Sequence, residues 1–314
     1  MHRAVGKFAA FLTLVLSLAS FIPVHAQGTV PVTTVVTALG PKYTPPPALS
    51  MNDINVFEGK DKRTVTGFTP AQGDKAGLQL AIVIDDATSI EAIGNQLSDI
   101  KNFITAQPKS TSIGVFYASN GGVQATSPFS ADKEAAAKGV RLPFGNGGAY
   151  TSIYLSTISL INGWPAPGPY TRREILLIAD GIDRFRGDPF SPDVQLTYEK
   201  AEKAGIMIHT LYASGVGRAG RNTFRVNYGQ SNLDQLTERT GGESFFQGLQ
   251  TPISFAPFLE QLDMVLKNQY FLSFKMDPPK NGKPQLRSFK IRTEQKNVDI
   301  SSADQVLVGG GGPK

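Results

Sequence analysis

Runs of apolar residues that end in a carboxylate set the pattern in the middle of the chain. Residues 78–84 are almost wholly apolar and end at Asp85, and residues 175–179 form a second such run that ends at Asp180. Residues 206–213 are a third apolar run. Runs of this length are typical of strands that are buried on both faces, as in a parallel sheet.

Between these runs, apolar residues recur at helical spacing. A hairpin is predicted where a strand at 112–119 meets residues 122–127 through the Asn120-Gly121 turn. A short strand is predicted at 243–247. Strand and helix alternation predicts an α/β fold, a doubly wound, mostly parallel sheet with helices on both faces. The predicted helices cover residues 89–107, 131–139, 151–161, 193–204 (closed by Gly205), 233–240 and 255–267.

Two β-rich segments flank this block. The first combines a short strand, a proline-broken loop and a hairpin around Glu58-Gly59-Lys60, and residues 67–77 are polar enough for a linker. The second has alternating strands after Lys267. The pattern leaves open whether the two segments fold together. The expected division is 1–26 signal peptide, 27–77 N-terminal β segment and linker, 78–267 α/β domain, 268–308 C-terminal β segment and 309–314 disordered tail.

The N-terminus predicts export. Arg3 and Lys7 precede an apolar stretch, and Val24-His25-Ala26 has the small residues of a signal-peptidase site. A membrane anchor is the alternative, but the stretch is short and interrupted by Pro23. No other segment is apolar and long enough to span a bilayer. We therefore expect a periplasmic, cell-surface or secreted protein without a membrane span after cleavage.

Composition excludes several classes of function. The net charge is +5, and losing Arg3 and Lys7 leaves +3, spread along the chain, so no nucleic-acid partner is expected. There is no cysteine, and His209 is the one histidine beyond residue 26, which excludes a His/Cys zinc site. A Ser-His-Asp triad would need His209, which lies in an apolar strand and is interpreted as a core residue.

Three polar sites follow predicted strands and loops that meet at one sheet edge. They are Asp85-Asp86-Ala87-Thr88-Ser89, the glycine-rich entry to Thr151, and Asp180-Gly-Ile-Asp183. Each has a structural alternative, since Ser89 and Thr151 can cap helices and the aspartates can form turns. Together, their hard oxygen atoms suit a Mg²⁺-like ion.

The order of these motifs resembles the von Willebrand factor type A domain. The likeness spans roughly residues 30–308 and is strongest over 78–275, including Leu233–Phe246. Residues 53–60 and 268–274 resemble the flanks of a bacterial, exported subgroup. The resemblance implies a metal-ion-dependent adhesion site with Asp85, Ser89, Thr151 and Asp180 as metal ligands and Asp86 and Asp183 just outside them.

One position departs from that pattern. The first serine of the family's Asp-x-Ser-x-Ser loop is Ala87 here, and a methyl group cannot coordinate a metal. Water can fill such a vacancy at magnesium, and Asp86 is a second substitute. We therefore expect Mg²⁺ binding to be weak or absent.

Two arginine-bearing loops should surround this edge. Residues 181–192 carry Arg184 and Arg186, and residues 213–230 form a long, glycine-rich loop. Long loops are often functional, and arginines pair with acidic groups of a partner protein. A solvated, mobile loop is the alternative. The arginines of the second loop are Arg218, Arg221 and Arg225.

Three functions remain, of which the first is favoured. It is an exported, non-enzymatic protein-interaction or adhesion module that binds its partner at the top of the sheet, through a degenerate metal site; the resemblance implies this binding role, and the residues themselves indicate an oxygen site. The second is a structural envelope protein with an inert metal site. The third is a metal-dependent hydrolase, disfavoured because no glycine-rich nucleotide motif follows the first apolar strand and no nucleophile elbow is present.

Overall fold

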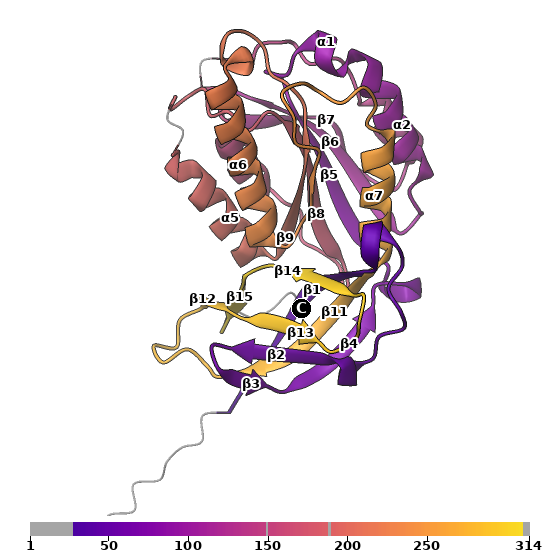
Figure 1. Cartoon of the computed structure of the whole chain (residues 1–314), viewed down its shortest axis with the longest axis vertical. Coiled ribbons are helices and arrows are strands. Elements are labelled where there is room, and N and C mark those ends of the chain that lie inside the picture. The colour runs from indigo at the N-terminus through magenta and orange to yellow at the C-terminus, as the bar shows by residue number, and fades with distance from the viewer. Residues whose placement is uncertain (1–27, 149, 188–189, 310–314) are drawn as a thin grey trace, which may run out of the picture.

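A computed structural model describes residues 28–148, 150–187 and 190–309 (Figure 1). The predicted signal peptide and all but Gly309 of the predicted tail lie outside the described residues. No helix in the described ranges has the length and apolar character needed to cross a bilayer.

The centre of the α/β block is a six-stranded sheet in the order β10-β9-β8-β5-β6-β7. Neighbouring strands run parallel except at the β6–β7 edge, where the Asn120-Gly121 turn joins an antiparallel hairpin. The predicted doubly wound, mostly parallel sheet is therefore confirmed. The strands are β5 (Leu78–Asp85), β6 (Thr111–Ser119), β7 (Gly122–Ser130), β8 (Arg172–Ala179), β9 (Ile206–Tyr212) and β10 (Ser244–Phe245).

Helices cover both faces of this sheet (Figure 1). On one face α2 (Leu97–Ala106), α3 (Lys133–Lys138) and α7 (Ala256–Lys267) bury apolar side chains against β5 and β6. The other face is covered by α4 (Ile153–Asn162), α5 (Pro192–Ala204) and α6 (Thr223–Thr240). As predicted, Gly205 closes α5, in the left-handed conformation at φ 61°.

Two helix predictions are wrong in their bounds. The helix predicted over 89–107 is divided into α1 (Ile90–Ile93), the 3-10 turn η4 (Gly94–Gln96) and α2, because Gly94 weakens the helix at that point. The helix predicted over 233–240 begins earlier, because the second half of the long loop predicted over 213–230 is helical from residue 223 on. Asn222 begins α6 there, since its side chain accepts a hydrogen bond from the Arg225 backbone at 3.0 Å.

Strands from both flanking segments share sheets below the α/β block (Figure 1). In the four-stranded sheet β14-β1-β11-β4, strand β1 pairs with β11, and β4 extends into the stretch predicted as a linker because Phe68 stacks on Tyr270. The strands are β1 (Val30–Leu39), β2 (Ile54–Glu58), β3 (Asp61–Arg63), β4 (Val65–Pro70), β11 (Gln269–Met276), β12 (Gln285–Ser288), β13 (Lys290–Thr293), β14 (Asp299–Ser302) and β15 (Gln305–Val308).

A buried polar network joins the central sheet to these strands. His209 on β9 approaches Oε2 of Glu174 on β8 at 2.8 Å, and its Nδ1 accepts the Glu243 backbone N–H at 3.0 Å. The ring proton therefore lies on Nε2 and is donated to Glu174. Gln269 on β11 donates to the same Glu174 oxygen at 3.3 Å. His209 is thus a structural core residue, as its apolar strand indicated.

Removing the acceptor of this network should destabilise the fold. We expect Glu174→Ala to lower the free energy of unfolding by about 3 kcal/mol, because His209 Nε2–H and the Gln269 amide lose their buried acceptor. Urea unfolding measures this. Glu260→Ala, on the exposed face of α7, is the matched control and should change stability by less than about 0.5 kcal/mol. A Glu174→Ala value as small as the control's would contradict the expectation.

Candidate functional site

The candidate site lies where β5, β8 and β9 end side by side. The loops after these parallel strands meet at the carboxyl edge of the sheet, the usual place for a binding site in such folds. Asp85 ends β5 and Asp180 follows β8, and both side chains are almost wholly buried, 3% and 1% exposed. A buried carboxylate needs a compensating charge or hydrogen bonds.

Arg184 supplies that charge to Asp180. Its guanidinium makes a two-pronged contact, Nη1 to Oδ1 at 3.0 Å and Nη2 to Oδ2 at 2.5 Å. Asp180 Oδ1 also accepts the Ile182 backbone N–H at 3.0 Å. Burial disfavours the charged guanidinium, but the contact with Asp180 outweighs it and raises the pKa of Arg184 above its usual value.

Asp85 lies in the same electrostatic environment. Its Oδ1 accepts the Ala87 backbone N–H at 2.8 Å. Burial raises the pKa of Asp85 to about 7; the positive charge of Arg184 opposes this rise and the negative charge of Asp180 adds to it. One guanidinium therefore neutralises Asp180 and leaves Asp85 only partly compensated.

Asp86 points away from this pair and is bound elsewhere. Arg141 contacts both of its oxygens, at 2.8 and 3.0 Å, and the Phe144 backbone N–H donates to Oδ1 at 3.2 Å. The Arg141 guanidinium also lies 3.7 Å from the centre of the Tyr117 ring. Asp86 therefore anchors the loop before α4 to the end of β5.

The two hydroxyls of the predicted metal set are also engaged. Ser89 Oγ donates to Glu91 Oε2 at 2.6 Å, and Thr151 Oγ1 donates to the Gly148 carbonyl at 2.5 Å. The Thr151 loop does reach the Asp180 loop, because the Phe185 N–H donates to the Thr151 carbonyl at 2.8 Å. The three chain segments meet at one edge, but these hydroxyls bind their own loops.

Asp183 and Arg186 shape the loop between β8 and α5. Asp183 accepts the Phe185 and Arg186 backbone N–H groups at 3.1 and 3.2 Å and the Ser191 hydroxyl at 2.6 Å. Arg186 pairs with Asp193 in the first turn of α5. Of the arginines predicted to face a partner, Arg184 and Arg186 are thus tied within the protein.

These donors do not fit a bound Mg²⁺. Ala87 offers no oxygen, both Asp180 oxygens face a guanidinium, and the Ser89 and Thr151 hydroxyls have partners. Within the described ranges no group of three or more His, Cys, Asp or Glu side chains is placed to hold a metal ion. Magnesium requires near-octahedral oxygen donors, and a fixed cation beside them opposes its entry.

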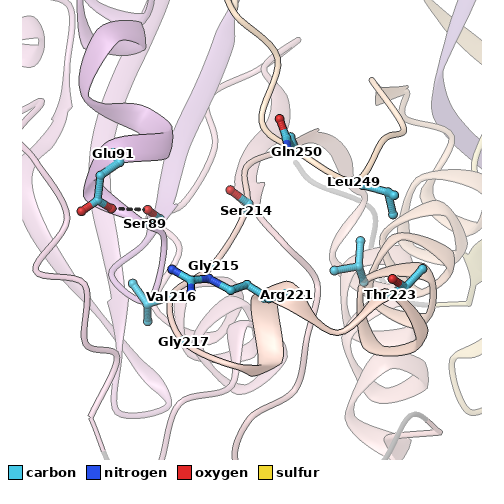
Figure 2. A pocket seen from close by; sticks show the side chains of 12 residues that line it. Ser89, Glu91, Ser214, Gly215, Val216, Gly217, Arg221, Thr223, Leu249 and Gln250 are labelled. Carbon is cyan, nitrogen blue, oxygen red and sulfur yellow. Dashed lines mark hydrogen bonds between the residues drawn. The ribbon is translucent and has the colours of Figure 1, made fainter.

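A pocket of about 410 Å³ lies between the loops that follow β5, β9 and β10. Ser89 and Glu91 form one side, Thr223 and Leu249 the other, and Arg221 reaches between them (Figure 2). Its floor is the loop after β9, held to the β5 loop because the Ser89 N–H donates to the Ser214 carbonyl and the Val216 N–H to the Ala87 carbonyl, both at 2.9 Å.

The floor contains the run Gly215-Val-Gly-Arg-Ala-Gly220, whose spacing also occurs in nucleotide-binding loops. Close packing accounts for Gly215 and Gly220, and a left-handed backbone conformation accounts for Gly217. A side chain on Gly215 would strike Arg184 and Asp180, Gly217 has φ 74°, and a side chain on Gly220 would strike the Gly215 carbonyl. The run therefore lets the loop close over the Arg184–Asp180 pair.

A rim of large, exposed apolar side chains surrounds this edge. Phe144, Phe190 and Phe224 are 66%, 76% and 60% exposed. Tyr150 and Phe185 pair their rings 5.1 Å apart across two loops. We call this set the aromatic rim: Ile90, Leu142, Phe144, Tyr150, Phe185, Phe190, Phe224 and Leu249.

Sequence reasoning missed the rim and the two buried arginine contacts. Nothing in the spacing of Asp180 and Arg184 marks a pair in an irregular loop, and Asp86 and Arg141 are 55 residues apart. The rim has a weak signal, since Phe144, Phe185, Phe190 and Phe224 stand in polar, glycine-rich stretches where no core is expected.

No protein-family model matches the chain, and a search of curated proteins finds no match to it. Solved structures with a similar arrangement include a von Willebrand factor type A protein from Catenulispora acidiphila (10% identity, 91% of this chain, 76% of that one, TM-score 0.45). BatB from Bacteroides thetaiotaomicron is another (16% identity, 61% and 100%, TM-score 0.44). A third is proximal thread matrix protein 1 of the mussel byssus, solved with a zinc-occupied MIDAS motif (15% identity, 62% and 46%, TM-score 0.41). The chain is thus similar to proteins with a von Willebrand factor type A domain.

Asp85 should make stability depend on pH. Its folded-state pKa of about 7 lies above the ordinary value of 3.8. The contribution of protonated Asp85 to folding stability is therefore fully present below about pH 4 and is lost as pH rises through 7. Asn cannot ionise. We therefore expect the free energy of unfolding of Asp85→Asn to rise relative to that of wild type, by up to roughly 4 kcal/mol, as pH increases from about 4 to 8. Urea unfolding across this range measures the difference.

Asp61→Asn, at an exposed position, is the matched control and should follow the wild-type profile. Burial also raises the pKa of Glu202 to about 7, but Glu202 is the same in all three proteins and cancels in the comparison. Parallel profiles for wild type and Asp85→Asn would contradict the expectation.

Proposed function

We propose that this chain is an exported, non-enzymatic module that binds an acidic segment of a partner protein at the carboxyl edge of its central sheet. The observation that carries the proposal is the aromatic rim. Large exposed apolar patches on a monomer mark interaction sites, and aromatic residues and arginine dominate the energetics of protein interfaces.

The charge of the edge supports an acidic partner. Arg218, Arg221 and Arg225 are exposed, and none forms an ion pair with another residue in the described part of the chain. Glu91 is the nearby acid of the pocket, and its pKa is lowered by the Ser89 hydroxyl, which keeps it ionised. Among the described residues, these three exposed guanidinium groups outnumber the Glu91 carboxylate, with which Arg221 interacts electrostatically, and the resulting positive charge attracts acidic side chains.

The shape of the edge favours an extended segment. The pocket is lined by polar groups on one side and by Leu249 and Val226 on the other, so it accepts a side chain with an acidic head. Leu249 lines it and the exposed Phe224 follows the lining residue Thr223 in the chain, so both can cover the partner's neighbouring apolar side chains. An acidic segment with interspersed apolar residues would match both features.

A non-enzymatic role agrees with the chemistry at the edge. The carboxylates that would act as acid or base are bound to arginines or backbone N–H groups, and Asp180 also lies against Gly215 of the β9–α6 loop. Export is inferred from the N-terminal sequence alone. A screen with phosphatase and ester substrates tests the first point, and turnover that Asp85→Asn abolishes would overturn it.

Charge reversal in the pocket should weaken partner binding. Immobilised wild-type protein is used to capture partners from an envelope extract, and the captured protein is then titrated by calorimetry. We expect Arg221→Glu to weaken its binding roughly tenfold or more, because Arg221 reaches into the pocket, and added salt to weaken wild-type binding.

Lys275→Glu, an exposed charge reversal on β11, is the matched control and should bind as wild type does. Binding that survives Arg221→Glu but is lost in Lys275→Glu would move the interface to the lower β sheets. That result would favour the structural, envelope-assembly role over the one proposed.

A further inference from the structure

The Arg184–Asp180 pair occupies the centre of the candidate site and is enclosed by it. The guanidinium side chain is 16% exposed and the Asp180 side chain 1% exposed. Gly215 of the neighbouring loop lies so close that any side chain there would strike both partners. The contact is therefore part of the packed edge, unlike an exposed ion pair at the surface.

Each residue of the expected ligand set around this pair already makes a hydrogen bond within the protein. Asp85 Oδ1 accepts a backbone N–H, Ser89 bonds to Glu91, and Thr151 bonds to the Gly148 carbonyl. Each of the expected oxygen ligands thus has a partner from its own loop. A metal ion would have to displace these hydrogen bonds one after another.

We propose that Arg184 permanently takes the place of the divalent cation at this site, so that the protein folds and forms its binding edge without a metal. A guanidinium matches a carboxylate with two parallel hydrogen bonds, which a spherical ion cannot do. A magnesium ion entering beside it would bring two more positive charges next to the guanidinium, while Asp85 is the one carboxylate of the pair that Arg184 leaves partly uncompensated to attract it. Coulomb repulsion at a few ångströms opposes this entry.

The substitution also changes how a partner can be held. A metal with open positions would accept a carboxylate from the partner directly, whereas Arg184 has both of its Nη groups committed to Asp180. The partner's acidic groups are left to Arg218, Arg221 and Arg225 on the surface. Binding should therefore resist chelators and weaken with salt; this consequence rests on the proposed function, but the cation replacement itself does not.

Thermal unfolding of the purified protein tests the replacement without any partner. The melting temperature is measured in chelator, in excess Mg²⁺ or Mn²⁺, and in NaCl of matched ionic strength. We expect wild type to melt within about 1 °C in all three, because a ligand that does not bind the folded state cannot stabilise it. A rise with Mg²⁺ or Mn²⁺ that NaCl does not reproduce would overturn the proposal.

Two variants test the role of Arg184 directly. Arg184→Ala should lower the melting temperature by on the order of 10 °C, because it leaves Asp180 buried without its cation. Combining it with Ala87→Ser, which restores an oxygen donor, should make the melting temperature rise with Mn²⁺ or Mg²⁺. If Arg184→Ala melts like wild type, Arg184 is not the compensating charge and the proposal fails.

Arg186→Ala is the matched control. It removes an arginine from the same loop that also pairs with an aspartate, Asp193, but makes no contact with Asp180. It should stay insensitive to the metals, and a metal response in this variant would count against the assignment to Arg184. If Arg184→Ala fails to fold, the comparison of wild-type melting temperatures in chelator, Mg²⁺ or Mn²⁺, and NaCl decides whether the proposal stands. None of these melting measurements uses a partner, so a failed capture experiment would count against the proposed function without affecting the cation replacement.

Discussion

The complete burial of the central strands, which excludes water from them, is the constraint on which the rest of this structure depends. Residues 80–84 of β5 and 175–179 of β8 have no exposed surface, because helices cover both faces of the sheet. Such strands cannot carry solvated charges along their length. Charged groups therefore collect toward the strand ends, where Asp85 and Asp180 lie at the carboxyl edge and Glu174 pairs with His209 nearer the other edge.

At both edges of the sheet, buried carboxylates are paired with side chains from other segments of the chain. Toward the lower edge, Oε2 of Glu174 is paired with His209 of β9 and Gln269 of β11, which joins the α/β block to the β sheets. At the carboxyl edge, arginines from two loops satisfy Asp180 and Asp86. In each case the partner fixes the position of a loop or strand as well as the charge. Stability and loop placement thus rely on the same contacts.

This arrangement separates the centre of the carboxyl edge from its surroundings. The centre, with Asp85, Asp180 and Arg184, is closed by the glycine-rich loop after β9. The surroundings hold the aromatic rim, the pocket and the exposed arginines. A centre that holds the surrounding loops in place suits recognition, because less ordering is then needed when a partner binds. In the proposed role, binding would be carried by the surroundings.

The chain sequence alone determined the sheet, most helices and the edge at which the acids meet. The apolar runs that end at Asp85 and Asp180 predict buried strands, and the helical spacing of apolar residues predicts the helices. Both patterns are local properties of the sequence. The start of α6 at Asn222 and the strand β4 needed the structure, because a cap and a stacked Phe68 gain their effect from neighbours. Only the tertiary structure decided that Arg184 faces Asp180 and that Arg141 reaches Asp86. The direction of a long side chain in an irregular loop depends on which carboxylate the fold buries beside it.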